Sequence, residues 1–126
     1  MGEPGFAQSD LARLRAEQEV RIETSAGEDE PVHRTVIWVV VDRQDRVLIR
    51  SYRGPDARWF REATENPHAR LYLGEHAIPV QVHAADDEER IEACSDGLLR
   101  KYAGDSATPR MVADEVLRTT LELTPA

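Results

Sequence analysis

The pattern of hydrophobic and polar positions predicts three strands in the first half of the chain. Val20, Ile22 and Thr24 alternate with polar residues, which is typical of a half-buried strand. The unbroken apolar run at residues 35–42, TVIWVVVD, is typical of a strand covered on both faces, and we expect it to be the central strand. A polar turn leads from it into a strand at residues 47–53, so these two segments form a predicted hairpin.

Three more strands are expected in the second half. The segments at residues 70–73 and 77–85 are separated by Gly-Glu-His and predict a second hairpin. Pro79 cannot donate a backbone hydrogen bond, so we expect its strand at a sheet edge or at a bulge. Leu117, Thr119, Leu121 and Leu123 alternate with polar residues and predict a last strand.

Helical spacing predicts three helices between these strands. The segment SDLARLRAEQ predicts a short helix capped by Ser9 or Asp10 and lying against the core. A second helix is expected from about Asp56 to Asn66, opened by Gly54. A third follows Asp86 in DDEERIEACSDGLLRKYAG. The fold class is therefore α+β, with six mostly antiparallel strands in a barrel or curled sheet flanked by about three helices.

Length and composition restrict the class of protein. The 126 residues are enough for a single domain, residues 1–126, in which residues 1–8 form a predicted flexible leader. The formal net charge of -8 disfavours general binding to nucleic acid. No apolar run is long enough to cross a membrane and no signal segment opens the chain, so we expect a cytoplasmic protein without a membrane partner. The four histidines and the single cysteine, Cys94, lack metal-ligand spacing, and no metal site is expected.

The segment IRSYRGPDARWFRE, residues 49–62, is the best candidate for a binding site because it gathers four arginines in an acidic chain. A strand, a glycine turn and a helix start form a geometry that binds anions. Arg50 and Arg53 are expected on opposite strand faces, so both reach one ligand only if the strand bends near Gly54. The alternative is that these arginines pair with acidic side chains of the protein itself, and both possibilities stay open. The candidate cofactor-binding residues are Arg50, Ser51, Arg53, Gly54 and Trp59, whereas Arg58 and Arg61 are assigned to solvent.

Two side chains are candidates for proton transfer. Tyr52 lies beside the glycine turn, and His33 precedes the central strand and could face a pocket, although a histidine at a strand start lies more often at the surface. Trp38 and Trp59 could stack on a flat ligand ring, but a tryptophan in such segments belongs more often to the core. Cys94 falls on the apolar stripe of its helix and is expected to be inert.

The combination of IWVVVD, RSYRGPDARWFR and the terminal TTLELTP resembles the DUF2255 family of uncharacterised bacterial proteins, over residues 21–125. The family name implies no activity. More distantly, the order of elements is similar to the flavin-binding split-barrel superfamily, which includes deazaflavin-dependent nitroreductases. The matching positions are Arg53-Gly54, Trp59-Phe60 and Asn66-Pro67. This resemblance implies a split β-barrel, a cofactor site at those positions and a homodimer.

The resemblance also bears on which cofactor is expected. The deazaflavin enzymes carry a basic loop before the central strand, whereas this chain has Gly27-Glu28-Asp29-Glu30. Three carboxylates would repel a polyanion, so FMN, with one phosphate, is a better candidate than F420, and the absence of any cofactor stays open.

Three functions are compatible with these residues. The first is a flavin-type oxidoreductase acting on a small molecule. The second is a cofactor-independent enzyme or binding module that uses the same pocket for an organic anion. The third is a dimeric scaffold without a ligand.

Overall fold

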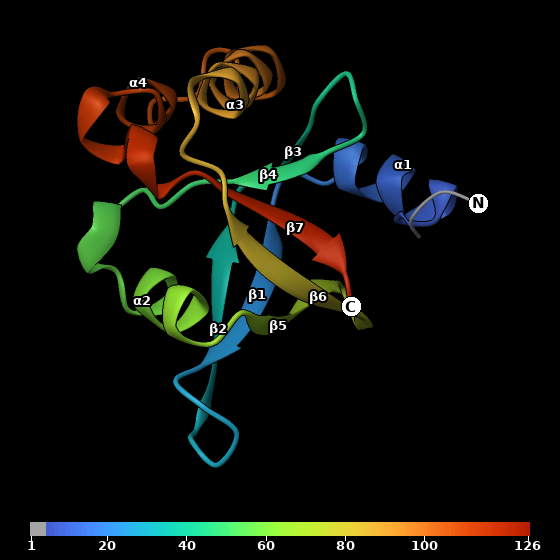
Figure 1. Cartoon of the computed structure of the whole chain (residues 1–126). Helices are drawn as coiled ribbons and strands as arrows, with labels where there is room; N and C mark the ends of the chain where they lie inside the picture. The colour runs from blue at the N-terminus through green and yellow to red at the C-terminus, as the bar shows by residue number, and fades with distance from the viewer. Residues whose placement is uncertain (1–4) are drawn as a thin grey trace.

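The computed structural model describes residues 5–126, and its central feature is one curled, antiparallel seven-stranded sheet (Figure 1). The strands are β1 Val20–Ser25, β2 Val32–Ile37, β3 Val40–Val41, β4 Val47–Ile49, β5 His68–Leu73, β6 His76–Ala84 and β7 Leu121–Pro125. They lie in the order β2-β1-β5-β6-β7-β4-β3. The α-helices are α1 Gln8–Ala16, α2 Arg58–Glu65, α3 Glu88–Lys101 and α4 Thr108–Met111, and the 3-10 helices are η1 Gly54–Asp56 and η2 Asp114–Thr119.

This architecture confirms the α+β class and the curled antiparallel sheet. The sheet has seven strands instead of the predicted six because the apolar run at residues 35–42 is divided between β2 and β3. The helices α3 and α4 lie together on one side of β3 and β4, while α2 lies against β1 and β2 (Figure 1). The sequence pattern missed α4 and η2, which are too short to show a helical periodicity.

The break in the apolar run occurs at Trp38 and Val39, where the side chains of α3 and its C-cap bind the backbone. The Val39 N–H donates to the Tyr102 hydroxyl over 3.2 Å, and the Lys101 ammonium donates to the Val39 carbonyl over 2.8 Å. These bonds satisfy the backbone of Val39 outside the sheet. The prediction of a central strand at residues 35–42 is therefore wrong, since β2 and β3 form the two opposite edges.

The hydrophobic core has two parts, separated by the β3–β4 hairpin. The larger part fills the inside of the curled sheet and includes Leu14, Ile22 and Leu71. The smaller part lies under α3 and includes Leu48 and Cys94. Every residue of β4 is buried. The strand that is covered on both faces is therefore β4 in this hairpin, one strand later in the chain than expected.

Three predicted details change in the structure. The strand β6 lies between β5 and β7 rather than at an edge, and Pro79 is tolerated because its carbonyl faces Ala126, where β7 ends. Leu117 and Thr119 belong to η2, so the last strand begins only at Leu121. The N-cap of α3 is Asp87, one residue later than expected.

Two features were predicted at the N-terminus, a flexible leader at residues 1–8 and a short helix after it, and the structure confirms the helix. Helix α1 begins at Gln8 with Ala7 as its N-cap and buries Leu11 and Leu14. It therefore includes the end of the predicted flexible leader, of which residues 1–4 lie outside the described part of the chain. No helix in residues 5–126 is long and apolar enough to span a bilayer.

Candidate functional site

A cleft of about 1130 Å³ lies between the end of β2, the η1 turn, the start of α2 and the region around α4. Its size is slightly above the usual range for small-molecule sites, about 300–1,000 Å³. Five arginines, three acids and three aromatic residues line it, together with smaller side chains. These residues are Arg34, Arg50, Arg53, Arg58 and Arg61; Glu19, Asp56 and Asp105; Trp38, Tyr52 and Trp59.

Arg50 borders this cleft, but the protein itself uses most of its hydrogen-bond donors. Its Nε donates to the Thr120 hydroxyl, and its two terminal nitrogens donate to the Ser95 hydroxyl and to the carbonyls of Met111 and Ile91, all over 2.9–3.0 Å. The side chain is 1% exposed, and burial lowers the pKa of its guanidinium. No carboxylate of the described residues pairs with it. Arg50 therefore joins α3 and the α4 region to β4 and β7, and its role toward a ligand stays a prediction.

The turn after Arg50 differs from the predicted strand and helix start. The strand β4 ends at Ile49, and the Ser51 N–H donates to the Thr119 hydroxyl. The Ser51 hydroxyl donates to the Gly54 carbonyl over 2.7 Å, and Gly54 has a φ of 79°. Glycine is suited to this left-handed conformation. Gly54 begins only a three-residue 3-10 turn, so the N-terminus of α2 lies at Arg58 and not beside Arg53 as expected.

Because the strand ends early, the alternation that separated Arg50 from Arg53 does not continue through the turn. Both residues and Tyr52 line the cleft. Ser51 and Gly54 are buried and do not line it, so in this structure they shape the turn.

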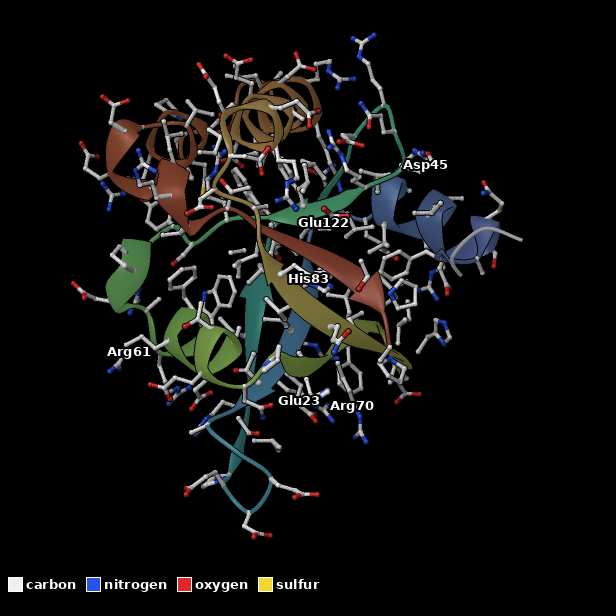
Figure 2. The ribbon with its side chains drawn as sticks, viewed as in Figure 1. Glu23, Asp45, Arg61, Arg70, His83 and Glu122 are labelled. Carbon is white, nitrogen blue, oxygen red and sulfur yellow. The ribbon has the colours of Figure 1, made fainter. Side chains whose placement is uncertain are left out.

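Arg53, Arg58 and Arg61 are the available cations of the cleft. All three are exposed, and no carboxylate in residues 5–126 lies within ion-pair distance of their guanidinium groups. Figure 2 shows Arg61 extending outward from α2. The assignment of Arg58 and Arg61 to solvent is confirmed, but both also border the cleft. They provide planar groups suited to phosphate or carboxylate.

Arg34 behaves differently from these three. Its Nε donates to Glu23 over 2.9 Å, its terminal nitrogen donates to the Tyr72 hydroxyl, and its guanidinium lies 4.0 Å from the Tyr72 ring centre. The hydrogen bond to Glu23 raises the pKa of Arg34. Glu23 also lies 3.8 Å from Arg70, and Figure 2 shows these two residues on the lower part of the sheet. Arg34 is therefore held by the sheet.

The aromatic side chains give the cleft flat surfaces. Trp38 stacks on Tyr102 with ring centres 3.9 Å apart. One ring face is covered in this way, and the side chain is half-buried rather than fully in the core. Trp59 is 7% exposed and belongs to the main core while its edge borders the cleft. Tyr52 is 51% exposed and is the aromatic ring most accessible to a ligand.

His33, the other candidate for proton transfer, does not line the cleft. It lies in β2, with its Nδ1 3.0 Å from a carboxylate oxygen of Glu62 in α2. The Thr24 hydroxyl donates to the same carboxylate over 2.9 Å. Sequence reasoning missed this buried Glu62, because its position on α2 gives no signal until β1 and β2 pack against the helix.

The acidic loop that bore on cofactor choice lies away from the cleft. Glu28, Asp29 and Glu30 sit in the connection between β1 and β2, which projects beyond the rest of the molecule (Figure 1). None of them lines the cleft. Within one subunit, these carboxylates are therefore not part of the arginine site.

Metal-ligating and nucleophilic groups are not gathered in the described residues. In residues 5–126, no group of three or more histidine, cysteine or acidic side chains is placed to hold a metal ion. Cys94 is fully buried, which confirms its place in the core, and burial raises the pKa of its thiol from 9.0 to about 11, which disfavours the reactive thiolate.

Comparison with known proteins identifies the family and the fold. A family model described as an uncharacterized protein conserved in bacteria, DUF2255, matches residues 10–123. No curated protein matches the chain.

Similar solved structures include HutZ, a heme storage protein from Vibrio cholerae, with a TM-score of 0.65 and 12% identity over 94% of this chain and 89% of that one. A putative pyridoxamine 5'-phosphate oxidase from Listeria innocua has a TM-score of 0.63 and 16% identity over 93% of this chain and 90% of its own. An F420-H2 dependent reductase has a TM-score of 0.61 and 12% identity over 85% of this chain and 94% of its own. At these identities the similarity shows the shared split-barrel fold.

Proposed function

Since the chain belongs to the DUF2255 family, whose description assigns no activity, we propose its function from the cleft: it binds a planar, anionic small molecule, with FMN as the first candidate. With that cofactor it would act as a flavin-type oxidoreductase on a small molecule. The observation that carries the proposal is the set of three arginines without an acidic partner beside an exposed tyrosine. Such an arrangement suits a phosphate joined to a flat ring.

The residues of the cleft fit FMN in charge and in shape. Arg53, which follows the exposed Tyr52 at the turn, is the side chain we assign to the phosphate, with Arg58 as a second donor. Tyr52 and the edge of Trp59 would lie against the ring system. Arg50 would act indirectly, by holding the turn that carries Arg53. The flavin would supply the redox chemistry, and the protein would hold it and exclude water.

The chemistry of the donors favours a flavin over haem and leaves F420 as the weaker candidate. Similar folds include a heme storage protein and an F420-H2 dependent reductase. Haem iron is most often held by histidine, and none of the residues that line this cleft is a histidine. Glu19, Asp56 and Asp105 line the cleft and disfavour a cofactor with several negative charges.

A homodimer is part of this proposal. The split-barrel resemblance implies one, and one of the similar structures is described as a domain-swapped dimer, with a TM-score of 0.61 and 12% identity over 86% of this chain and 80% of that one.

Titration of the purified protein with FMN tests the proposal. We expect flavin absorbance or fluorescence to change on binding, and Arg53→Ala to weaken the affinity by about ten- to a hundredfold, because a charge-assisted hydrogen bond contributes about 1.5–3 kcal/mol. Arg43→Ala is the matched control, since Arg43 is exposed and does not line the cleft. A colourless protein that binds neither FMN nor F420 would remove the flavin-type function.

The second candidate is a cofactor-independent enzyme or binding module for an organic acid. It is favoured by the exposure of Tyr52 beside Arg53, since the arginine could bind a carboxylate while the phenol exchanges a proton. Tyr52 is supported by Arg110, whose Nε donates to the Tyr52 carbonyl over 3.1 Å. A carboxylate ligand that binds the parent but not Arg53→Ala, in a protein that ignores flavins, would support this candidate.

The scaffold without a ligand is the least supported. It requires that Arg50 and Arg53 be saturated by acidic partners and that no cleft lie beside them. Arg50 bonds only to hydroxyls and carbonyls, and both arginines line the cleft.

A further inference from the structure

We propose that two copies of this chain pair along their β2 edges, so that the acidic hairpin tip of each copy docks at the arginine cleft of the other. The hairpin tip is the connection between β1 and β2, residues 26–31, and its docking residues would be Glu28, Asp29 and Glu30. Its targets would be Arg53, Arg58 and Arg61. The inference rests on the homodimer proposed above and not on the identity of the ligand.

The first observation is the open edge of β2. This strand pairs only with β1, which leaves a row of backbone donors and acceptors at the sheet edge. Val32 and Val36 are 61% and 55% exposed, and they are two of the four most exposed large hydrophobic residues in the described part of the chain. An edge that carries exposed valines is suited to pairing with another strand.

The second observation is the hairpin tip itself. It projects away from the sheet and the helices (Figure 1). Glu28, Asp29 and Glu30 are exposed, and no basic group in residues 5–126 lies within ion-pair distance of them. The chain thus presents three free carboxylates at one place and three free guanidinium groups at another. Complementary patches of this kind guide association.

The third observation is the register that an antiparallel β2–β2 pair would adopt. A two-fold axis beside Arg34 sets the exposed Val32 directly opposite Val36 of the partner subunit, and such cross-strand apolar pairs stabilise a sheet. The same register carries Glu30 alongside Trp38 of the partner subunit, which lines the cleft. The two Arg34 side chains would approach each other, but each is already paired with Glu23.

The docked tip would change what the cleft accepts. Five arginines and three acids line the cleft in one subunit, an excess of positive charge that three further carboxylates would remove. A ligand with a single phosphate or carboxylate could still displace the tip from one arginine, whereas a polyanion would meet repulsion from the remaining carboxylates. The tip would therefore act as a selectivity element supplied by the partner.

Charge reversal tests the contact. The tip-reversed variant carries E28R, D29R and E30R, and the cleft-reversed variant carries R53E, R58E and R61E. All six positions are exposed, so both variants should fold. In sedimentation velocity at low salt we expect a dimeric parent and an at least hundredfold weaker dimer for each variant alone. An equimolar mixture should dimerise again, because both contacts of the mixed dimer join opposite charges.

The control variant carries E65R, E75R and E92R, which make the same change in net charge as the tip-reversed variant, at exposed acids outside the tip. It should remain as dimeric as the parent. The proposal is overturned by a monomeric parent, by reversed variants that stay dimeric, by a mixture that stays monomeric, or by a control that dissociates equally.

This test is independent of the flavin titration. Restored dimers in a protein that ignores FMN would remove the flavin-type function alone, while FMN binding by a monomeric parent would remove the homodimer and the tip contact and leave the flavin-type function standing. If both proposals hold, the tip-reversed variant should bind F420 at least about tenfold more tightly than the parent does, since its dimer is lost and the repulsive carboxylates no longer lie at the cleft.

Discussion

Arg50 and Arg53 are three positions apart in one turn, yet they lie in opposite environments. Arg50 is 1% exposed and makes four hydrogen bonds to neutral acceptors from α3, from α4 and from the residue that precedes β7. Arg53 is exposed and makes no ion pair with the described residues. The buried layer, meaning Arg50 and the residues that accept its four hydrogen bonds, therefore contributes to stability. The cleft around Arg53 is available for binding. Density of arginine in a sequence does not distinguish these roles.

The largest expected effect is on Arg50. Replacing it by methionine should lower the free energy of unfolding by about 3–5 kcal/mol, because buried acceptors such as the carbonyls of Met111 and Ile91 lose their donor. Urea denaturation measures the loss. Arg50→Lys should recover only part of it, since one ammonium cannot reach all four acceptors. A loss below about 1 kcal/mol would contradict the stabilising role of the buried layer.

The second effect is a pH dependence of the free energy of unfolding, which originates at the buried thiol of Cys94 in α3. The pKa of Cys94 is about 11 in the fold against its ordinary 9.0, because burial opposes the thiolate. The unfolded chain therefore loses this proton first as the pH rises above 9, and the stability that Cys94 contributes below pH 9 should fall by about 2 kcal/mol by pH 11. Cys94→Ala should lack this fall, as measured by urea denaturation across the range from about pH 8 to about pH 11.

Lys101 provides the control for that measurement because it titrates in the opposite sense. Burial lowers the pKa of its ammonium from 10.5 to about 8, so its contribution to stability should rise between pH 8 and 10.5. Lys101→Met should remove this rise. If the Cys94→Ala and parent curves run parallel above pH 9, the assigned shift of the thiol is wrong.

A smaller effect is expected at the rim of the buried layer. Ser95→Ala removes one acceptor of Arg50, whose same nitrogen still donates to the Met111 carbonyl. The free energy of unfolding should fall by about 1 kcal/mol. Ser106→Ala is the matched control, since Ser106 is exposed and no side-chain hydrogen bond involves it within the described chain. Equal losses in the two variants would place Ser95 outside the network.

The smallest effect on stability is expected in the cleft. Arg53→Ala should change the free energy of unfolding by no more than about 0.5 kcal/mol, because the side chain is exposed and makes no ion pair within residues 5–126. Thermal or urea unfolding measures this change. A loss of about 2 kcal/mol or more would erase the contrast with Arg50 and would identify Arg53 as another structural residue.

The sequence alone predicts much of the candidate site, although not how it works. The segment at residues 49–62 supplies Arg50, Tyr52, Arg53 and Trp59, and all of them line the cleft. Arg34 and Asp105 come from distant parts of the chain and gave no local signal. His33 has the right chemistry, but the packing of α2 directs it to Glu62 instead of the cleft.

What the sequence determined by itself is local: the periodicity that forms α1 and α3, the β5–β6 hairpin and the turn chemistry of Gly54. Only the tertiary structure decided where each strand lies in the sheet and which side chains are bound by the protein itself. The run at residues 35–42 has the composition of a central strand, but hydrogen bonds from Tyr102 and Lys101 divide it between the two sheet edges. Arg50 and Arg53 are chemically identical, and only the acceptors brought together by α3, α4 and β7 make one structural and leave the other free. Periodicity reports which residues prefer burial, whereas distant partners decide where the backbone bonds and the charges are satisfied.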